Sequence, residues 1–115
     1  MSDYITIGDF LKQTFKRWWE IQKELGRIRK VRIVVDGKVD EVQCFIGSFS
    51  LRERESLGNI IPVDASKASF TVPVDKNSSI EVDGKIYSPT PIAEIPWGEI
   101  KEYVVALVPE KGGEK

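Results

Sequence analysis

The sequence has no histidine and a single cysteine among its 115 residues. Without histidine it cannot form a Ser-His or Cys-His catalytic pair or an imidazole metal site. The single cysteine, Cys44, excludes an internal disulfide and a thiolate zinc site. The glycines do not have the spacing of a phosphate-binding loop. The sequence therefore predicts a non-enzymatic protein with no catalytic residue, no metal and no cofactor.

Long apolar runs are also absent. No run approaches the roughly 20 residues that cross a bilayer, and the start, Met-Ser-Asp-Tyr, lacks the basic and apolar regions of a secretory signal. We therefore expect no membrane partner and a protein made in a reducing cytoplasm. Cys44 lies between Val42 and Ile46 in a predicted strand, which favours a buried small apolar residue over a reactive thiol.

Length and composition predict one globular domain over residues 1–115, with 41% hydrophobic and 30% charged residues. The charge is uneven. Residues 1–38 hold nine Lys and Arg against five Asp and Glu, whereas the rest of the chain holds eight against thirteen. A basic N-terminal part and an acidic C-terminal part favour head-to-tail contact between copies. The alternative is an ordinary solvated surface of mixed charge.

Residues 9–25 are predicted to form a helix, because apolar residues recur there at three- and four-residue spacing. Thr6 or Asp9 can cap its start, and Gly26 is suited to end it. The stripe consists of Phe10, Leu11, Thr14, Phe15, Trp18, Ile21 and Leu25. Trp19 flanks this stripe beside Arg17. It either covers the edge of the core or belongs to a subunit interface.

Two Asp-Gly pairs, Asp36-Gly37 and Asp83-Gly84, separate alternating apolar and polar runs, which is a strong signal for β-hairpins. The fold class predicted is mainly β: a small antiparallel β-barrel or sandwich over residues 27–108, with one N-terminal α-helix. Strands are expected at 27–35, 39–49, 60–63, 68–74 and 103–108, with a bulge or bend at Gly47. Pro89, Pro91 and Pro96 are expected to break their run into short pieces. The expected core residues are Ile33, Val35, Phe70, Val72, Ile80, Val82, Val105 and Leu107.

Residues 50–59 are charged and lack strand alternation, so they predict a projecting loop with room for a helical turn. Residues 109–115 are expected to be a flexible tail. The carboxylate pairs Asp40/Glu41, Glu53/Glu55 and Glu99/Glu102 are interpreted as solvated surface groups. The candidate interface residues are Arg17 and Trp19 of the helix and Leu51, Arg52, Glu53, Arg54 and Glu55 of the loop.

Several segments, taken in order, resemble one family. These are Cys44–Phe49, a charged loop, Ala68–Val74, the hairpin Ile80–Tyr87 and the closing strand Val104–Val108. This order is similar to that of the head-tail connector proteins of long-tailed bacteriophages, the head-completion or stopper proteins of the lambda head-tail joining type. The match spans residues 31–108. The Pro89-Thr90-Pro91 insertion and the strong N-terminal helix depart from the pattern and leave adaptor or tail-terminator roles open.

The resemblance implies a virion protein, assembled in the host cytoplasm, that forms a hexameric or dodecameric homo-oligomeric ring. The ring would contact portal or adaptor and tail proteins and would pass DNA without sequence-specific contact. The alternative is a β-barrel binding module for protein or single-stranded nucleic acid. Aromatic residues without interleaved Lys or Arg on the strands, and a pI near 5.5, argue against a dedicated nucleic-acid binder.

Overall fold

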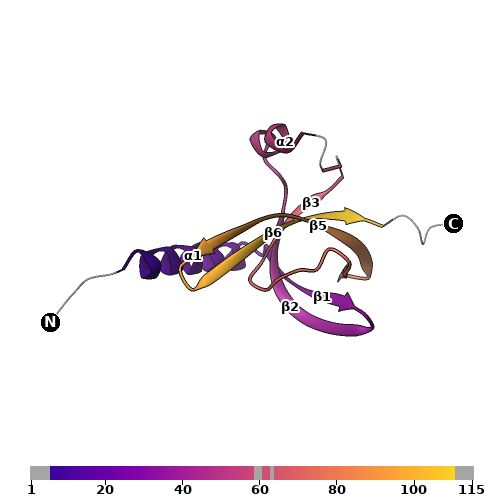
Figure 1. Cartoon of the computed structure of the whole chain (residues 1–115), viewed down its shortest axis with the longest axis horizontal. Coiled ribbons are helices and arrows are strands. Elements are labelled where there is room, and N and C mark those ends of the chain that lie inside the picture. The colour runs from indigo at the N-terminus through magenta and orange to yellow at the C-terminus, as the bar shows by residue number, and fades with distance from the viewer. Residues whose placement is uncertain (1–5, 59–60, 63, 111–115) are drawn as a thin grey trace.

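The computed structural model describes residues 6–58, 61–62 and 64–110 of the chain. Six strands form a closed barrel in the order β1-β2-β3-β6-β5-β4, and every neighbouring pair is antiparallel (Figure 1). The mainly β barrel with an N-terminal helix is therefore confirmed. The elements are α1 (Ile7–Glu24), β1 (Ile28–Val35), β2 (Lys38–Gly47), α2 (Leu51–Leu57), β3 (Ser66–Phe70), β4 (Ser79–Val82), β5 (Lys85–Trp97) and β6 (Ile100–Pro109).

Both Asp-Gly pairs form the predicted hairpin turns. Asp36 and Gly37 have φ of 50° and 79°, and Asp83 and Gly84 have φ of 51° and 82°. Positive φ at both central residues defines a type I′ turn, whose twist matches that of the flanking strands. These turns connect β1 to β2 and β4 to β5 and so set the register of two of the six strand pairs.

Substituting Gly84 with Val is expected to destabilise the protein by about 1–2 kcal/mol, because a β-branched residue is strained at positive φ. A Cβ at Gly84 would have no atom within 4 Å, so the cost comes from the backbone alone. Urea unfolding would measure the effect, with Lys85→Val at the next, exposed position as the control. An unchanged midpoint for Gly84→Val would rule out the type I′ turn.

The barrel interior is closely packed with aliphatic side chains around Phe70. The buried cluster consists of Val31, Ile33, Cys44, Ala68, Phe70, Ile80, Val82, Val105 and Leu107. Six of the eight expected core residues belong to it, Val35 packs against its edge, and Cys44 is fully buried as predicted. The exception is Val72, which is exposed because β3 ends at Phe70 and the chain then leaves the sheet.

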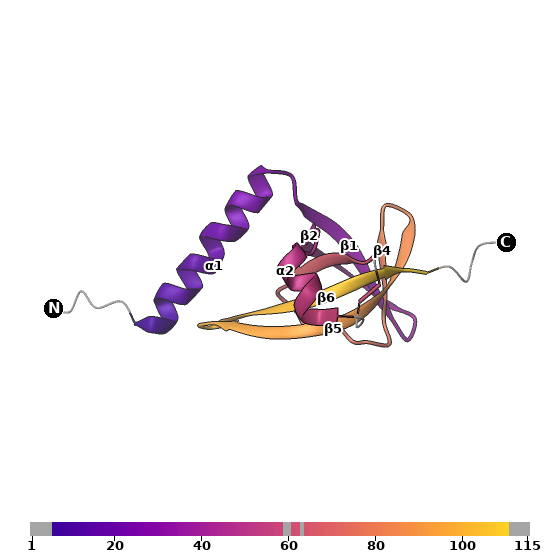
Figure 2. The same ribbon diagram turned by 90° about the horizontal axis from the view of Figure 1, so that it is seen from above.

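The three prolines do not break their run, and that prediction is wrong. β5 continues through Pro89, Pro91 and Pro96 for 13 residues, with one irregularity between Pro91 and Ala93. β4 pairs only with the first three residues of β5, so the prolines lie where β5 has β6 as its single neighbour. A missing N–H is tolerated at such an edge. Past the barrel, β5 and β6 extend together as a two-stranded arm beside α1 (Figure 2).

Helix α1 begins two residues earlier and ends one residue earlier than the predicted 9–25, and of the two candidate caps Thr6 is the one used. The Thr6 side chain accepts a hydrogen bond from the Asp9 N–H at 3.0 Å, and Gly26 has φ of 75° after the last turn. These caps bind the backbone N–H and C=O groups that a helix end leaves unpaired. Within the part of the chain described, no helix has the length and apolar character required to span a membrane.

Three further strand predictions need correction. The strand expected at 60–63 is not formed at Ile61 and Pro62, and its other residues lie outside the described part of the chain. Gly47 is the last residue of β2 and not a bend within it. The final strand is longer than expected and starts at Ile100. Of the expected tail, Pro109 closes β6 and Glu110 donates its N–H to Ile86 O at 3.1 Å, while residues 111–115 lie outside the description.

Candidate functional site

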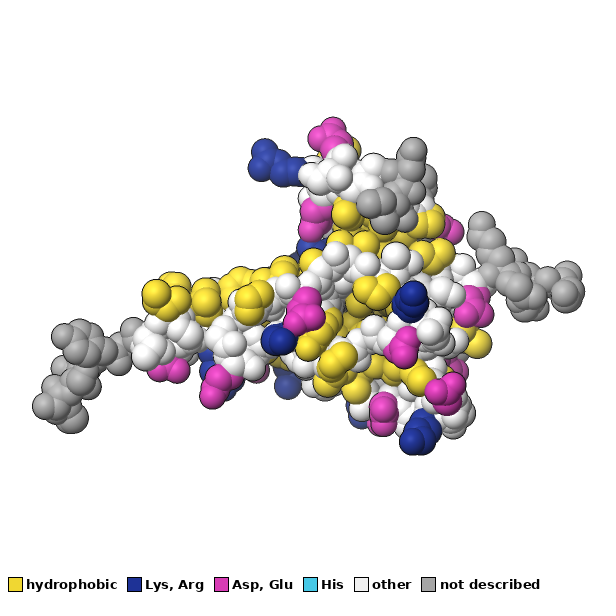
Figure 3. Space-filling model, in the orientation of Figure 1, with side chains coloured by type: hydrophobic (Ala, Val, Ile, Leu, Met, Phe, Trp, Pro, Cys, Tyr) yellow, Lys and Arg dark blue, Asp and Glu magenta, His cyan; other side chains and the backbone are white. Residues whose placement is uncertain are grey.

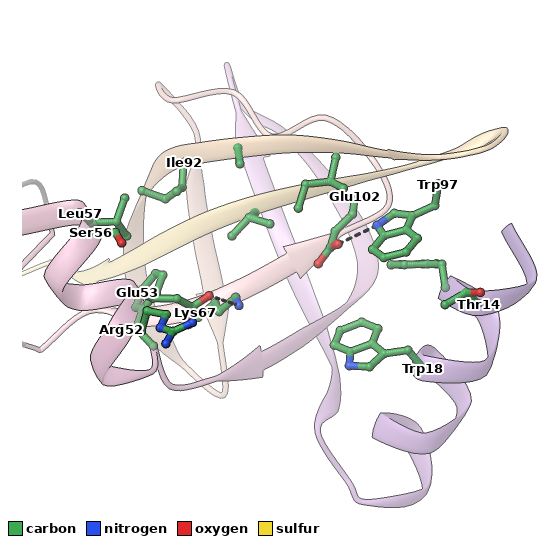
Figure 4. Close-up of a pocket in the computed structure, with 15 residues that line it drawn as sticks. Thr14, Trp18, Arg52, Glu53, Ser56, Leu57, Lys67, Ile92, Trp97 and Glu102 are labelled. Carbon is green, nitrogen blue, oxygen red and sulfur yellow. Dashed lines mark hydrogen bonds and ion pairs between the residues drawn. The ribbon is translucent and has the colours of Figure 1, made fainter. Parts of the chain in front are cut away.

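A groove with a volume of about 660 Å³ lies between α1, α2 and the β5–β6 arm (Figure 4). Its walls are mostly apolar, with few polar groups, which is typical of binding sites. It is lined by Thr14, Phe15 and Trp18 of α1, by Phe49, Arg52, Glu53, Ser56 and Leu57 in and before α2, by Lys67 of β3, and by Ile92, Ala93, Ile95, Trp97, Glu102 and Val104 of the arm. We call this site the groove.

One wall of the groove is α2, in the segment for which a projecting loop was predicted. Ser50 Oγ accepts a hydrogen bond from the Glu53 N–H at 3.1 Å, and Glu53 Oε1 accepts one from the Ser50 N–H at 2.8 Å. This is a capping box, which the Ser-x-x-Glu spacing of residues 50–53 encodes. The loop prediction is corrected accordingly: Leu51–Leu57 is a capped helix, while Asn59 lies outside the described residues.

Glu53 also connects α2 to the barrel. Its Oε2 lies 2.5 Å from Lys67 Nζ of β3, and this ion pair crosses the floor of the groove (Figure 4). The hydrogen bond from Lys67, together with that from the Ser50 N–H, lowers the pKa of the Glu53 carboxyl from its ordinary value. The charges of Glu53 and Lys67 therefore compensate each other within the protein.

Arg54 holds α2 to the segment that follows it. Its guanidinium lies 5.7 Å from the centroid of the Phe49 ring and donates to Pro62 O at 3.4 Å and Ala65 O at 3.3 Å. Beneath this contact lies a second buried cluster of Phe49, Ile61, Ala65 and Ala106. The contacts of Arg54 are therefore made within the protein, where they hold α2 in place.

Glu102 is buried, contrary to the prediction of a solvated carboxylate. Its side chain accepts hydrogen bonds from Ser69 Oγ at 2.7 Å and from Trp97 Nε1 at 2.9 Å. Glu102 is only 8% exposed, and buried polar groups are normally hydrogen-bonded. The hydroxyl of Ser69 on β3 and the indole N–H of Trp97 on β5 provide these hydrogen bonds. The bond to Trp97 holds the indole against the end of the groove nearest α1 (Figure 4).

Aromatic rings attach α1 to the arm and to the barrel. The Phe15 ring centroid lies 5.7 Å from those of Trp18 and Trp19 and 5.9 Å from that of Trp97 on β5. Trp18 also lies 5.1 Å from the ring of Phe45 on β2. These separations are within the range of favourable aromatic pairs. The cluster fixes α1 as one wall of the groove.

Most of the apolar stripe on α1 is nevertheless uncovered. Phe15 is buried, but Ile7, Phe10, Ile21 and Leu25 are 79%, 61%, 48% and 57% exposed. In Figure 3 hydrophobic atoms run along the upper edge of the left-hand part of the molecule toward the barrel. We call the four exposed residues Ile7, Phe10, Ile21 and Leu25 the α1 strip. The predicted apolar stripe is therefore covered only in part, because α1 rests on the arm by one side only.

The candidate interface residues fall into two groups. Arg17 is exposed and Trp19 half-buried on α1, and Trp19 lines a separate cavity next to Lys16 and Glu20. On α2, Leu51, Arg52 and Glu55 are exposed and Glu53 and Arg54 half-buried. Only Arg52 and Glu53 of the seven line the groove. Sequence reasoning missed Glu102 and Trp97, for which no local pattern gave a signal.

The described residues contain no cluster of three or more His, Cys, Asp or Glu side chains arranged to hold a metal ion.

Comparisons with known proteins give no match: no family model, curated protein or solved structure is significantly similar to this chain.

Proposed function

We propose that the protein is a structural, non-enzymatic subunit of a connector ring between the head and tail of a long-tailed bacteriophage. In this role it continues the DNA channel below the portal and offers a docking surface to the tail. The sequence resemblance over residues 31–108 supports the proposal. So does the arrangement of the resembling segments, since the hairpin of β4 and β5 and the strand β6 are neighbours in one barrel.

The observation that carries the proposal is that a small barrel leaves two large apolar features uncovered on one side. They are the groove, which is lined in part by Thr14 and Trp18 of α1, and the α1 strip, whose Phe10 and Ile21 lie one turn from these two residues. Exposed apolar patches of this kind mark interaction surfaces in soluble proteins. The two ends of the molecule, the free end of α1 and the turn of the β1–β2 hairpin, present different surfaces (Figure 2). Different complementary faces are what a closed ring of identical subunits requires.

The alternative of a single-stranded nucleic-acid binder has weaker support. Such binders stack bases on accessible aromatic rings along a basic groove. Here Phe15, Trp18 and Trp97 pack on one another or on the barrel. A protein-binding module remains the stronger alternative, and the experiment below separates it from a connector.

The test uses DNA-filled heads from a phage that lacks this protein. Wild-type protein is expected to bind the heads as a ring visible by electron microscopy, to retain their DNA and to permit tail joining. Arg52→Glu is expected to fold normally but to reduce the count of DNA-retaining particles, because it reverses an exposed charge at the groove.

Lys76→Glu, an equal charge change in an exposed turn away from the groove, serves as the control and should behave as wild type. Arg54 is left unchanged because its bonds to Pro62 and Ala65 support the fold. Folded wild-type protein that fails to bind heads would end the connector proposal.

A further inference from the structure

The groove and the α1 strip form one apolar corner with an arginine on each of its two edges. Arg52 lines the groove on the α2 side, and Arg17 lies on α1 one turn from Ile21 of the strip. Neither arginine forms any of the ion pairs found among the described residues, whereas Glu53 is paired with Lys67. A partner that fits this corner should therefore present apolar side chains flanked by acidic ones.

The far end of the same molecule has that chemistry. The turn of the β1–β2 hairpin lies at the opposite end of the molecule from the free end of α1 (Figures 1 and 2). Near the turn, Val39 is 55% exposed, and the exposed charged residues around it are Asp36, Asp40 and Glu41 against one lysine, Lys38. These three carboxylates are absent from the ion pairs found among the described residues.

Two other exposed apolar side chains, Leu51 and Leu25, are less suitable. Leu51 is adjacent in sequence to Arg52, so it would bring a positive charge toward a positive edge, and Leu25 is part of the α1 strip itself. Like charges brought together at an interface cost binding energy. The β1–β2 hairpin combines an exposed apolar residue with a surplus of negative charge.

We infer that the β1–β2 hairpin of one copy docks in the apolar corner between α1 and α2 of the next copy, with Val39 against the apolar wall and its acidic neighbours facing Arg17 and Arg52. This inference rests on the proposed function and deepens it, since it names the contact that joins adjacent subunits. The hairpin and the corner belong to opposite ends of one chain, so the occupant is a second copy. Such a head-to-tail contact generates a ring when the rotation between copies closes.

The contact can be trapped by disulfide formation between two variants that each carry one introduced cysteine. Lys38→Cys lies at the hairpin and Ser56→Cys lines the groove, and both residues are exposed, so all the proposed acidic and basic partners are retained. The native Cys44 is fully buried, and burial raises the pKa of its thiol to about 12, so it should not react. Trapping accumulates even a weak contact between copies, because the disulfide does not dissociate on a non-reducing gel.

A mixture of the two variants is expected to give a covalent dimer on a non-reducing gel, and neither variant alone should do so. A chain that carries both introduced cysteines should give a ladder beyond the dimer. Asp40→Lys in the hairpin variant should abolish the dimer, and Arg52→Glu in the groove variant should restore it. Lys76→Glu should leave the yield unchanged.

Three results would overturn the inference: no dimer in the mixture, equal dimer from either variant alone, or a doubly substituted chain that stops at the dimer. Failure of this inference can be distinguished from failure of the connector proposal. Covalent ladders with no binding to heads would contradict the connector role but support the contact between copies. Binding to heads without crosslinks would support the connector role but contradict the contact.

Discussion

Truncating Leu107 to Ala is expected to lower the free energy of unfolding by about 2–4 kcal/mol, the range for a buried leucine replaced by alanine. Leu107 is 1% exposed and lies inside the barrel on β6, which pairs with both β3 and β5. Its neighbours on these two strands are fixed by the backbone ladders, so the cavity left behind can collapse only in part. Urea unfolding followed by far-UV circular dichroism would give the change.

Ile86→Ala is the control for this prediction. Ile86 is 48% exposed on β5, so a similar loss of aliphatic carbon should change stability by only about 0.5 kcal/mol or less. Equal midpoints for Leu107→Ala and wild type would show that β6 does not face the core.

The barrel could be predicted because its signals are local. Each Asp-Gly pair fixes a turn by the φ values it allows, and the alternation on either side then decides which residues face inward. Ile33 and Ile80, which stand opposite each other on β1 and β4, were both assigned to the core from that alternation. The capping box of α2 was an equally local signal, in Ser50 and Glu53, but it was interpreted as part of a loop.

The errors concern features that depend on distant neighbours. Pro89 and Pro91 lie within a long strand because β4 is short and leaves one edge of β5 unpaired. The shortness of β4 cannot be inferred from the sequence around the prolines. Val72 fits the alternation of β3, but no partner strand extends far enough to pair with it.

The candidate site shows the same limit. Periodicity identified the apolar face of α1, but it could not tell that the arm would cover Phe15 and leave Phe10 exposed. Glu102 resembled any surface carboxylate in the sequence. Its burial follows from the approach of Ser69 and Trp97, which are supplied by other strands. The groove is therefore a product of how α1, α2 and the arm meet, and only the structure could reveal it.

Substituting Gly98 with Ala is expected to destabilise the protein by at least about 2 kcal/mol, with its main effect on the docking of α1. Gly98 connects β5 to β6 at the tip of the arm and has φ of 69°, so any side chain there is strained. A Cβ would also overlap the backbone carbonyl of Gly8 in the first turn of α1. The clash is with backbone atoms, which cannot rotate away as the end of a side chain could. The helix and the arm must therefore move apart, and Phe15 becomes less buried.

Tryptophan fluorescence measures this movement directly, because the three tryptophans of the chain, Trp18, Trp19 and Trp97, surround Phe15 at the contact between α1 and the arm. Gly98→Ala should shift the fluorescence of the native protein and lower the urea midpoint. Gly84→Ala is the matched control: its φ of 82° gives similar strain, but its Cβ would have no atom within 4 Å. It should lower the midpoint less and leave the fluorescence unchanged. Equal effects of the two substitutions on both measurements would mean that the arm tip does not hold α1, and the groove would then lose one of its walls in solution.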